Sequence, residues 1–291
     1  MKPFKYFSRF PILLLSLSLT FFLTQSVYAG TCVSGLQSGV WSSSGSPYII
    51  VGGVTVPEGE TLRIEPGTVI LISPQESGFG GAFRLEGTLI AQGLPTRRII
   101  FSALDLESLV IDPNNPEACS GREKKEPGVW VGLQFFTPGP GSILLNCDIR
   151  YAGRDGSPSI SISGTGIEDT NLTISSCRIT DGDGEGILMN SGASPLILNT
   201  LVENHAETGI VELAPSCHPV VRGCSSKSNG GYAVEAFAGN VRNYDRLFIA
   251  GNQTNAFRIT SEPITASGEW LDHGAPYHYN RGDQFAIPVR E

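Results

Sequence analysis

Apolar and polar residues alternate along this chain in short runs, and one arrangement of them recurs three times between Leu172 and Val234. Equivalent apolar residues stand at Ile174, Ile197 and Val221, which places the repeats 23 and 24 residues apart. Short alternating runs are typical of β-strands. Because a unit of this length cannot bury its apolar face alone, a period in the twenties predicts a β-solenoid whose coils stack on one another.

Turn-forming residues occupy equivalent positions in the three repeats. Small or amide residues stand at one position and turn formers at a later one: Ser176, Asn199 and Gly223, then Asp181, Asn204 and Ser228. These residue types favour bends, where the backbone is often left-handed. We expect Asn252 at such a bend in a weaker fourth repeat. We expect the apolar set Ile174, Ile197 and Val221 to point inward and stack.

The same alternation begins earlier, where Val54, Leu62 and Val69 start short runs between Gly and Pro residues. Runs so close together leave no room for helices, so consecutive strands must wrap rather than alternate with helices. From residue 51 to residue 259 the spacing predicts roughly nine coils of 22 to 25 residues each. The periodicity lapses over 103–129, a segment with Pro and charged residues that we expect to leave the solenoid as a surface loop.

Four stretches stand out in chain order between Gly39 and Gly153: GVWSSSGSPYIIVGGVTVPEGETLRIEPGTVILI, GTLIAQGLPTRRIIFSA, GVWVGLQFF and LLNCDIRYAG. They resemble the opening module of bacterial secreted right-handed parallel β-helix repeat proteins. The resemblance implies an all-β fold, a right-handed parallel β-helix of the pectate-lyase-like superfold, in an extracellular or cell-surface setting. That family is mixed in function, and it implies no catalytic residues for this chain.

The N-terminus has the pattern of an export signal. Lys2, Lys5 and Arg9 precede an apolar run, and small residues end it at Ala29. This order is that of a secretory signal peptide, so we interpret residues 1–29 as a signal cleaved after Ala29. The protein is then secreted, extracellular or at the cell surface, with the periplasm as an alternative. An uncleaved membrane anchor is the competing interpretation, and the mature chain has no second run of spanning length.

The chain after the signal divides in two. Residues 30–264 form the predicted solenoid domain. Beyond it, GEWLDHGAPY from Gly268 repeats GVWSSSGSPY from Gly39, so residues 265–291 are interpreted as the start of a truncated second module. Because the other strands of such a module would be missing, we expect a poorly capped C-terminal end. A chain that stops near Ile264 should then be no less stable.

Composition supports an exported all-β protein and excludes some partners. Of the 291 residues 16% are charged, with 35 Gly and 19 Pro, which suits strands joined by many turns. The net charge of −8 leaves no basic field to hold nucleic acid or an anionic membrane. The same negative charge disfavours polyanionic sugars.

All six cysteines lie in the predicted mature part, so disulfides are allowed but their pairing is open. Cys147 and Cys177 share one coil position, which Thr200 and Cys224 continue. We interpret these residues as a stack of small side chains inside the solenoid, because free Cys often packs as a small apolar residue. A redox or metal role is the alternative.

Two clusters hold residues that could carry chemistry. Carboxylates alternate at Asp181, Asp183 and Glu185 in a Gly-rich stretch, and such oxygens could bind calcium, although bends explain Asp181 equally well. No other cofactor is predicted. Glu203, His205 and Glu207 alternate in VENHAETG, and a carboxylate beside an imidazole could serve acid/base chemistry on a sugar. An exposed polar turn explains this second cluster as well.

The leading functional hypothesis is a secreted or cell-surface parallel β-helix with a structural, adhesive or glycan-binding role, its partners being glycans or cell-surface components. The competing hypothesis is a polysaccharide lyase or glycoside hydrolase that uses outward carboxylates and His205 in a surface groove. Groups of Asp, Glu, Lys, Arg or His that converge on adjacent coils would favour the enzyme.

Overall fold

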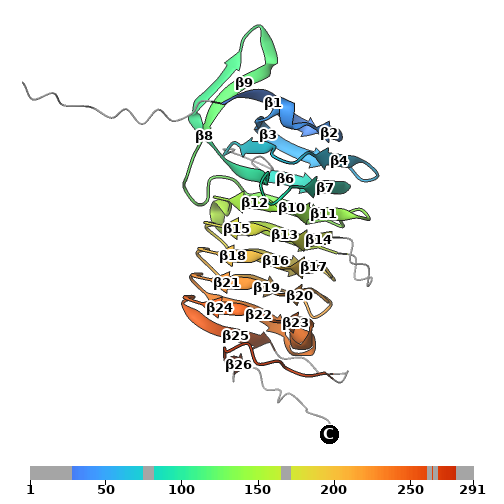
Figure 1. Ribbon diagram of the computed structural model, residues 1–291, viewed down its shortest axis with the longest axis vertical. Coiled ribbons are helices and arrows are strands. Elements are labelled where there is room, and N and C mark those ends of the chain that lie inside the picture. Colours follow the sequence, from blue (N-terminus) through green and yellow to red (C-terminus); the bar gives the residue numbers. More distant parts are fainter. Residues whose placement is uncertain (1–27, 75–81, 165–171, 261–263, 265–267, 280–291) are drawn as a thin grey trace, which may run out of the picture.

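The computed structural model describes residues 28–74, 82–164, 172–260, 264 and 268–279. Short parallel strands stack along one axis to form a solenoid (Figure 1). Residues 1–27, which make up nearly all of the expected export signal, and 280–291 of the expected second module lie outside the described residues. None of the helices in the described part has the length and apolar character that a membrane crossing requires.

The first face of the solenoid is a sheet of eight parallel strands among the described residues. In chain order these are β2 (Gly39–Trp41), β4 (Thr61–Ile64), β7 (Thr88–Gln92), β11 (Ser142–Leu145), β14 (Leu172–Ser175), β17 (Leu196–Leu198), β20 (Val220–Arg222) and β23 (Tyr244–Asp245). The predicted number of roughly nine coils is therefore not confirmed.

Two further faces complete each coil. The second face contains β5 (Val69–Ile72), β8 (Ile99–Asp112), β12 (Cys147–Arg150), β15 (Arg178–Thr180), β18 (Leu201–Glu203), β21 (Ser225–Lys227) and β24 (Phe248–Ala250). The third contains β6 (Ala82–Leu85), β10 (Gly132–Phe136), β13 (Ile160–Ser163), β16 (Ile187–Asn190), β19 (Ile210–Glu212), β22 (Tyr232–Phe237), β25 (Thr254–Thr260) and β26 (Tyr277–Tyr279).

Longer strands and short 3-10 helices join the faces. Strands β1 (Tyr28–Leu36) and β3 (Tyr48–Val56) run across both the second and the third face, since the first half of β3 pairs with β5 and its second half with β6. The 3-10 helices are η1 (Ser43–Gly45), η2 (Arg154–Gly156) and η3 (Ala238–Asn243).

The repeated apolar positions form the core, as predicted. Ile174 pairs in register with Ile197, and Ile197 with Val221, so their side chains stack across three coils. All three side chains are fully buried. Alternation along each strand sends the neighbouring residues outward, which explains why these strands read as apolar and polar in turn.

Left-handed bends flank the second-face strands. The six predicted turn positions are confirmed, because their φ angles lie between 47° and 64°. In the fourth repeat the left-handed residue is Gly251, so the prediction for Asn252 was wrong by one residue. Asn252 instead lies buried next to the bend. The bend falls on Gly251, which adopts a positive φ without the strain that a side chain would cause.

At the N-terminal end a hairpin covers strand β1, where the sequence predicted a surface loop over 103–129. Strand β8 continues past its coil and pairs antiparallel with β9 (Asn115–Glu123), and the hairpin stands beyond the end of the stack (Figure 1). Strand β9 also pairs antiparallel with β1, and a disulfide joins Cys32 to Cys119. The sequence pattern does not predict the hairpin strands, because both faces of the outer part of the hairpin are solvent-exposed and show no apolar alternation.

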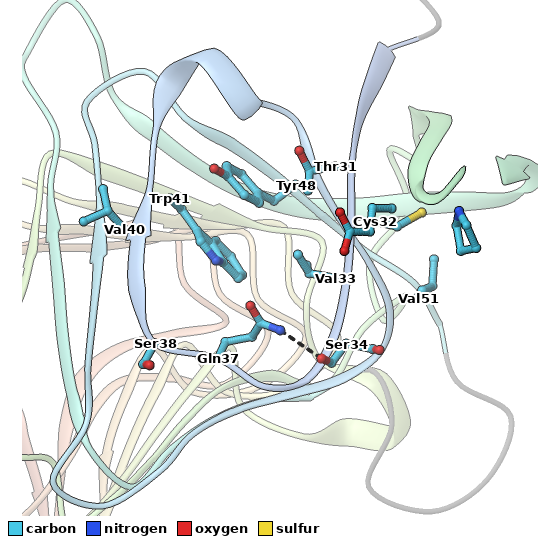
Figure 2. Close-up of a pocket in the computed structure, with 12 residues that line it drawn as sticks. Thr31, Cys32, Val33, Ser34, Gln37, Ser38, Val40, Trp41, Tyr48 and Val51 are labelled. Atoms are coloured by element: carbon cyan, nitrogen blue, oxygen red, sulfur yellow. Dashed lines mark hydrogen bonds between the residues drawn. The ribbon is translucent and has the colours of Figure 1, made fainter. Parts of the chain in front are cut away.

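Aromatic side chains cover both ends of the core. At the N-terminal end Trp41 stacks on Tyr48 with ring centres 4.6 Å apart (Figure 2). At the C-terminal end Trp270 lies 5.1 Å from Tyr277, which lies 5.1 Å from buried Phe257. Strand β26 also pairs with β25, so residues 268–279 lie over the last coil, where the sequence predicted a poorly capped end.

The two copies of the repeated terminal sequence lie in different places. Tyr48 pairs with Ile70 on the second face, whereas Tyr277 pairs with Phe257 on the third. A similar order of Trp, Pro and Tyr therefore closes the stack in both cases, but by different strands. The sequence likeness alone could not distinguish a cap from the start of another module.

Candidate functional site

His205 points into the solenoid, so it is not part of a surface groove. Its ring is 2% exposed, and Nδ1 donates to Asn229 Oδ1 at 3.3 Å while Nε2 lies 3.1 Å from the hydroxyl oxygen of Ser159. Burial lowers the pKa of His205 to about 4. The imidazole is therefore neutral at pH 7 and belongs to a buried ladder.

Buried amides continue this ladder along the axis. Asn229 Nδ2 donates to Asn252 Oδ1 at 2.8 Å, and Asn252 Nδ2 donates to the carbonyl of Ser226 at 2.9 Å. The side chains of His205, Asn229 and Asn252 thus each have a hydrogen-bond partner on a neighbouring coil, as buried polar groups require. The sequence analysis did not identify Asn229, although its place one coil after His205 was a usable signal.

The two carboxylates beside His205 lie apart from its ring. Glu203 is half-buried on the outer surface of β18 and pairs with Lys227 at 3.1 Å on the next coil. Glu207 is exposed in the following turn. The structure therefore brings none of the three groups together for acid/base chemistry on one substrate.

The three candidate calcium ligands also differ in their surroundings. Asp181 lies in a left-handed bend, where its Oδ1 accepts from Asn204 Nδ2 at 3.2 Å. Asp183 is exposed, and Glu185 is half-buried on the third-face side. Burial raises the pKa of Glu185, and the charges of Glu207 and Glu235 add to that rise. Within the described residues no three such groups gather closely enough to hold a metal ion, so calcium here stays a prediction.

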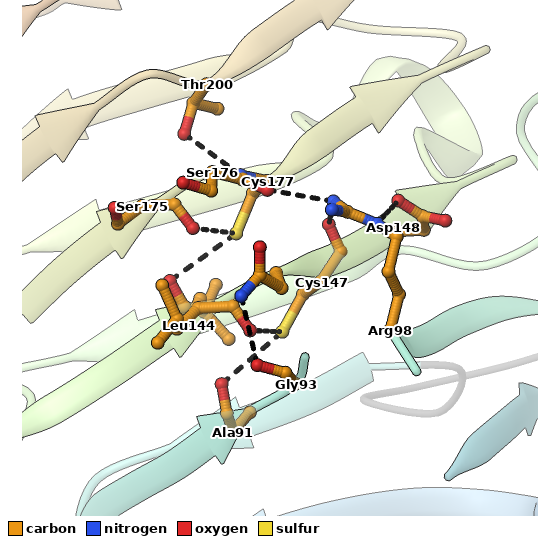
Figure 3. A network of polar contacts seen from close by, with 12 residues as sticks. Ala91, Gly93, Arg98, Leu144, Cys147, Asp148, Ser175, Ser176, Cys177 and Thr200 are labelled. Atoms are coloured by element: carbon orange, nitrogen blue, oxygen red, sulfur yellow. Dashed lines mark hydrogen bonds and ion pairs between the residues drawn. The ribbon is translucent and has the colours of Figure 1, made fainter. Parts of the chain in front are cut away.

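The predicted stack of small side chains is present. Cys147, Cys177, Thr200 and Cys224 are all buried at one coil position, and the thiols hydrogen bond to backbone carbonyls. Figure 3 shows the Cys147 and Cys177 part of this stack. Burial raises the pKa of the Cys147 thiol, and it raises that of Cys224 to about 11. The hydrogen bond with Cys147 instead lowers the pKa of Cys177. Cys147 and Cys224 are thus protonated, buried thiols, which are poor nucleophiles and fit a packing role.

Arg98 fastens the outside of the same stack. Its Nε donates to Asp148 Oδ1 at 2.6 Å, and its Nη2 donates to the carbonyls of Cys147 and Ser176 at 2.8 and 2.9 Å (Figure 3). One guanidinium thus satisfies backbone carbonyls on two successive coils, one of them at the left-handed bend of Ser176. Because the Arg98 guanidinium is already engaged in these contacts, the cluster stabilises the fold and offers few groups to a ligand.

A different group of residues lines a pocket near the C-terminal end of the third face. Strands β22, β25 and β26 are parallel and in register, so Glu235, Arg258 and His278 lie side by side on three successive coils. Their neighbours Val234 and Phe257 point inward and are buried, which directs this second set outward. The outward side chains of Glu235, Arg258 and His278 are therefore spaced by the distance between neighbouring strands.

The pocket holds about 390 Å³ and is lined by Tyr232, Arg258, His278 and Tyr279. The rings of Tyr232 and His278 stand at 89° with centres 5.9 Å apart. The guanidinium carbon of Arg258 lies 6.0 Å from the centre of the Tyr232 ring. The pocket thus combines aromatic faces with hydrogen-bond donors, which suits a ligand that is apolar on one side and polar on the other.

Glu235 orients the polar wall of this pocket. Its Oε1 accepts from Arg258 Nη1 at 3.2 Å and from the Thr208 hydroxyl at 3.1 Å. The carboxylate therefore holds the guanidinium in place and offsets its charge. No sequence motif marks this site, because its residues come from three strands. Only the pairing of β22 with β25, which contains a register shift, and of β25 with β26 brings them together.

Comparison with known proteins supports the fold. Residues 134–261 match the family model described as a right handed beta helix region. No curated protein and no solved structure gives a significant match. The matched part is under half of the chain and includes Glu235 and Arg258 of the pocket. For that part, the match supports the parallel β-helix family and the predicted right-handed coil.

Proposed function

We propose that the protein is an exported parallel β-helix module of the cell surface or its surroundings that binds neutral glycans in the pocket of Tyr232, Arg258, His278 and Tyr279. The observation that carries this proposal is the pairing of aromatic rings with a fixed guanidinium in one pocket of about 390 Å³. Sugar rings present C–H groups on their faces and hydroxyls on their edges, which such a pocket matches.

The charge of the protein selects among glycans. Arg258 is already paired with Glu235, so the pocket has no surplus cation for a uronate carboxylate. The net charge of −8 repels polyanions at longer range. A neutral oligosaccharide meets neither penalty.

Two features support the exported setting of this proposal. The order of charged, apolar and small residues at 1–29 is that of a secretory signal. The bond between Cys32 and Cys119 is of the kind that persists in oxidising compartments. The long stack would then serve as a stiff support that presents the pocket away from its point of attachment.

Calorimetric titration with a panel of neutral hexasaccharides tests the binding site. We expect one of them to bind, and Tyr232→Ala to weaken it about tenfold by removing one aromatic face. Phe248→Ala is the matched control, because Phe248 is 58% exposed on the neighbouring face and outside the pocket. Binding that Tyr232→Ala leaves unchanged, or no binding by any member of the panel, would contradict the proposal.

An assay with pectate and alginate separates this proposal from a lyase. A lyase needs a base near the sugar carbon and a cation to neutralise the uronate. We expect no unsaturated product, with or without calcium. A product that absorbs in the ultraviolet and disappears in Asp183→Ala while the fold survives would favour the enzyme.

A further inference from the structure

The N-terminal end of the solenoid has an open strand edge. Strand β2 is the first strand of its sheet, and among the described residues it pairs only with β4. The carbonyl of Trp41 accepts from the N–H of Glu65 at 3.0 Å, so Trp41 directs its backbone groups at β4. Successive residues of a strand alternate in this respect, and Val40 therefore directs its N–H and C=O at the open side.

Exposed apolar side chains gather at the same end. Val40, on the open strand itself, is 59% exposed, and Leu36, at the end of the preceding strand β1, is 74% exposed. The hairpin that stands beyond this end adds Leu106, Val110 and Ile111, so five of the eight large apolar side chains exposed in the described part belong to this region. Exposed apolar side chains concentrated at one end of a molecule are a feature of interaction surfaces.

A cavity lies between the open edge and the part of the hairpin next to its turn (Figure 2). Its volume is about 560 Å³, and β1, Val40, Trp41 and Tyr48 line it together with Pro116 and Glu117 of β9. The side chain of Gln37 donates to the carbonyl of Ser34 at 2.9 Å and closes the turn beneath it. The cavity is large enough for one or two apolar side chains.

The hairpin gives this surface a negative charge. Residues 104–117 contain four carboxylates and no Lys or Arg, namely Asp105, Glu107, Asp112 and Glu117. Arg122, nearer the base, lies 3.5 Å from Asp105, and Glu117 lines the cavity itself. A ligand at this end therefore meets acidic groups beside the apolar ones.

We propose that the N-terminal end is a docking site for an extended polypeptide segment of another protein, with apolar and basic residues in alternation, which adds to β2 as a parallel strand. The N–H and C=O of Val40 on the open side can pair with the backbone of an added strand. The cavity can accept an apolar side chain, and the hairpin carboxylates favour Lys or Arg. A second copy of the chain would bring the same carboxylates against each other. The site is separate from the glycan pocket at the opposite end.

Fluorescence anisotropy tests the proposal with the full chain and a labelled octapeptide of alternating Val and Lys. Saturable binding is expected, with none to the octapeptide of alternating Val and Glu. Val40→Pro removes the N–H at the open edge without touching the β4 ladder, and Glu117→Lys reverses a charge at the cavity. Each should weaken binding about tenfold. Leu213→Lys, at a side chain 53% exposed, is the matched control and should bind like the original protein.

Three results would overturn the proposal. The first is the absence of binding to the Val and Lys octapeptide at low salt. The second is equal weakening by Leu213→Lys, which would show a general charge effect. The third is a dimer in sedimentation that Val110→Lys dissociates, which would assign this end to a second copy. If Val40→Pro does not fold, Glu117→Lys and Val40→Lys decide the question, because both side chains lie at the solvent-exposed rim.

Discussion

The central coils and the two ends of this solenoid are stabilised in different ways. Between β14 and β24 each coil repeats the contacts of the one before it, with in-register apolar residues inside and a left-handed bend on each side of the second-face strand. The ends have no such repetition. An antiparallel hairpin and a disulfide cover β1 at one end, and a cluster of aromatic rings covers the other.

This difference distinguishes contacts between neighbouring coils from contacts with distant parts of the chain. A central coil needs only its two neighbours, as expected for a stack of repeated units. An end has one neighbour missing, so it must take its cover from elsewhere in the chain. Changes in the centre should therefore act through buried contacts, and changes at the ends through the loss of cover.

The largest expected effect is a buried charge in the centre. Ile197→Asp should unfold the protein or cost more than about 4 kcal/mol, because an unpaired carboxylate would enter a fully apolar stack. Denaturant unfolding measures it. Leu198→Asp, at the outward neighbour on the same strand, should cost far less, and so should Glu203→Asp. Similar losses for Ile197→Asp and Leu198→Asp would show that the inside and outside assignments are wrong.

Loss of the disulfide should weaken the N-terminal end. Cys32→Ser with Cys119→Ser should lower the free energy of unfolding by about 2–4 kcal/mol, because the bond restrains a long loop of the unfolded chain. Hydrogen exchange should rise first in β1 and β9. Reduction of the original protein should give the same pattern. Faster exchange spread evenly over β14 to β24 would instead show that the disulfide stabilises the whole stack.

His205 should make the centre sensitive to acid. Its pKa of about 4 in the folded protein lies below the ordinary value of 6.5, so the unfolded chain binds the proton more readily. The stability from neutral His205 is complete above pH 6.5 and is lost as the pH falls towards 4, by about 3 kcal/mol. His205→Asn, which continues the ladder of amides, should remove this component. An identical pH profile for the variant would refute it.

The smallest expected effect is the loss of the C-terminal cover. A chain that stops at Ile264 exposes Phe257, which is now fully buried, and should lose about 2 kcal/mol. Thermal unfolding measures the change, and Trp270→Ala with Tyr277→Ala should reproduce most of it. A truncated chain as stable as the full one would support the earlier interpretation of residues 265–291 as the beginning of a second module.

The sequence was sufficient for the centre of the fold because its signals are local and repeated. Ile174, Ile197 and Val221 could be placed inside from their period alone, and the left-handed bends from residue types that favour them. The stack of Cys147, Cys177 and Cys224 followed from the same alignment.

The ends and the candidate site depend on pairings that no local pattern contains. Cys119 could have paired with any of the other cysteines, and only the antiparallel contact of β9 with β1 brings it to Cys32. His205 was expected outside because it stands between two carboxylates, yet the bend at Asn204 turns it inward. Tyr232, Arg258 and His278 meet only through the register of three strands.

The place of β9 in the chain also governs the order in which the molecule can be completed. Strand β1 pairs on one side with β3, which follows it closely in the chain. Its other neighbour, β9, includes Cys119, which follows Cys32 by 87 residues. When the chain emerges with its N-terminus first, the coils of β3 to β7 are already available before that strand appears. The end that is made first is therefore completed only after further coils have followed it.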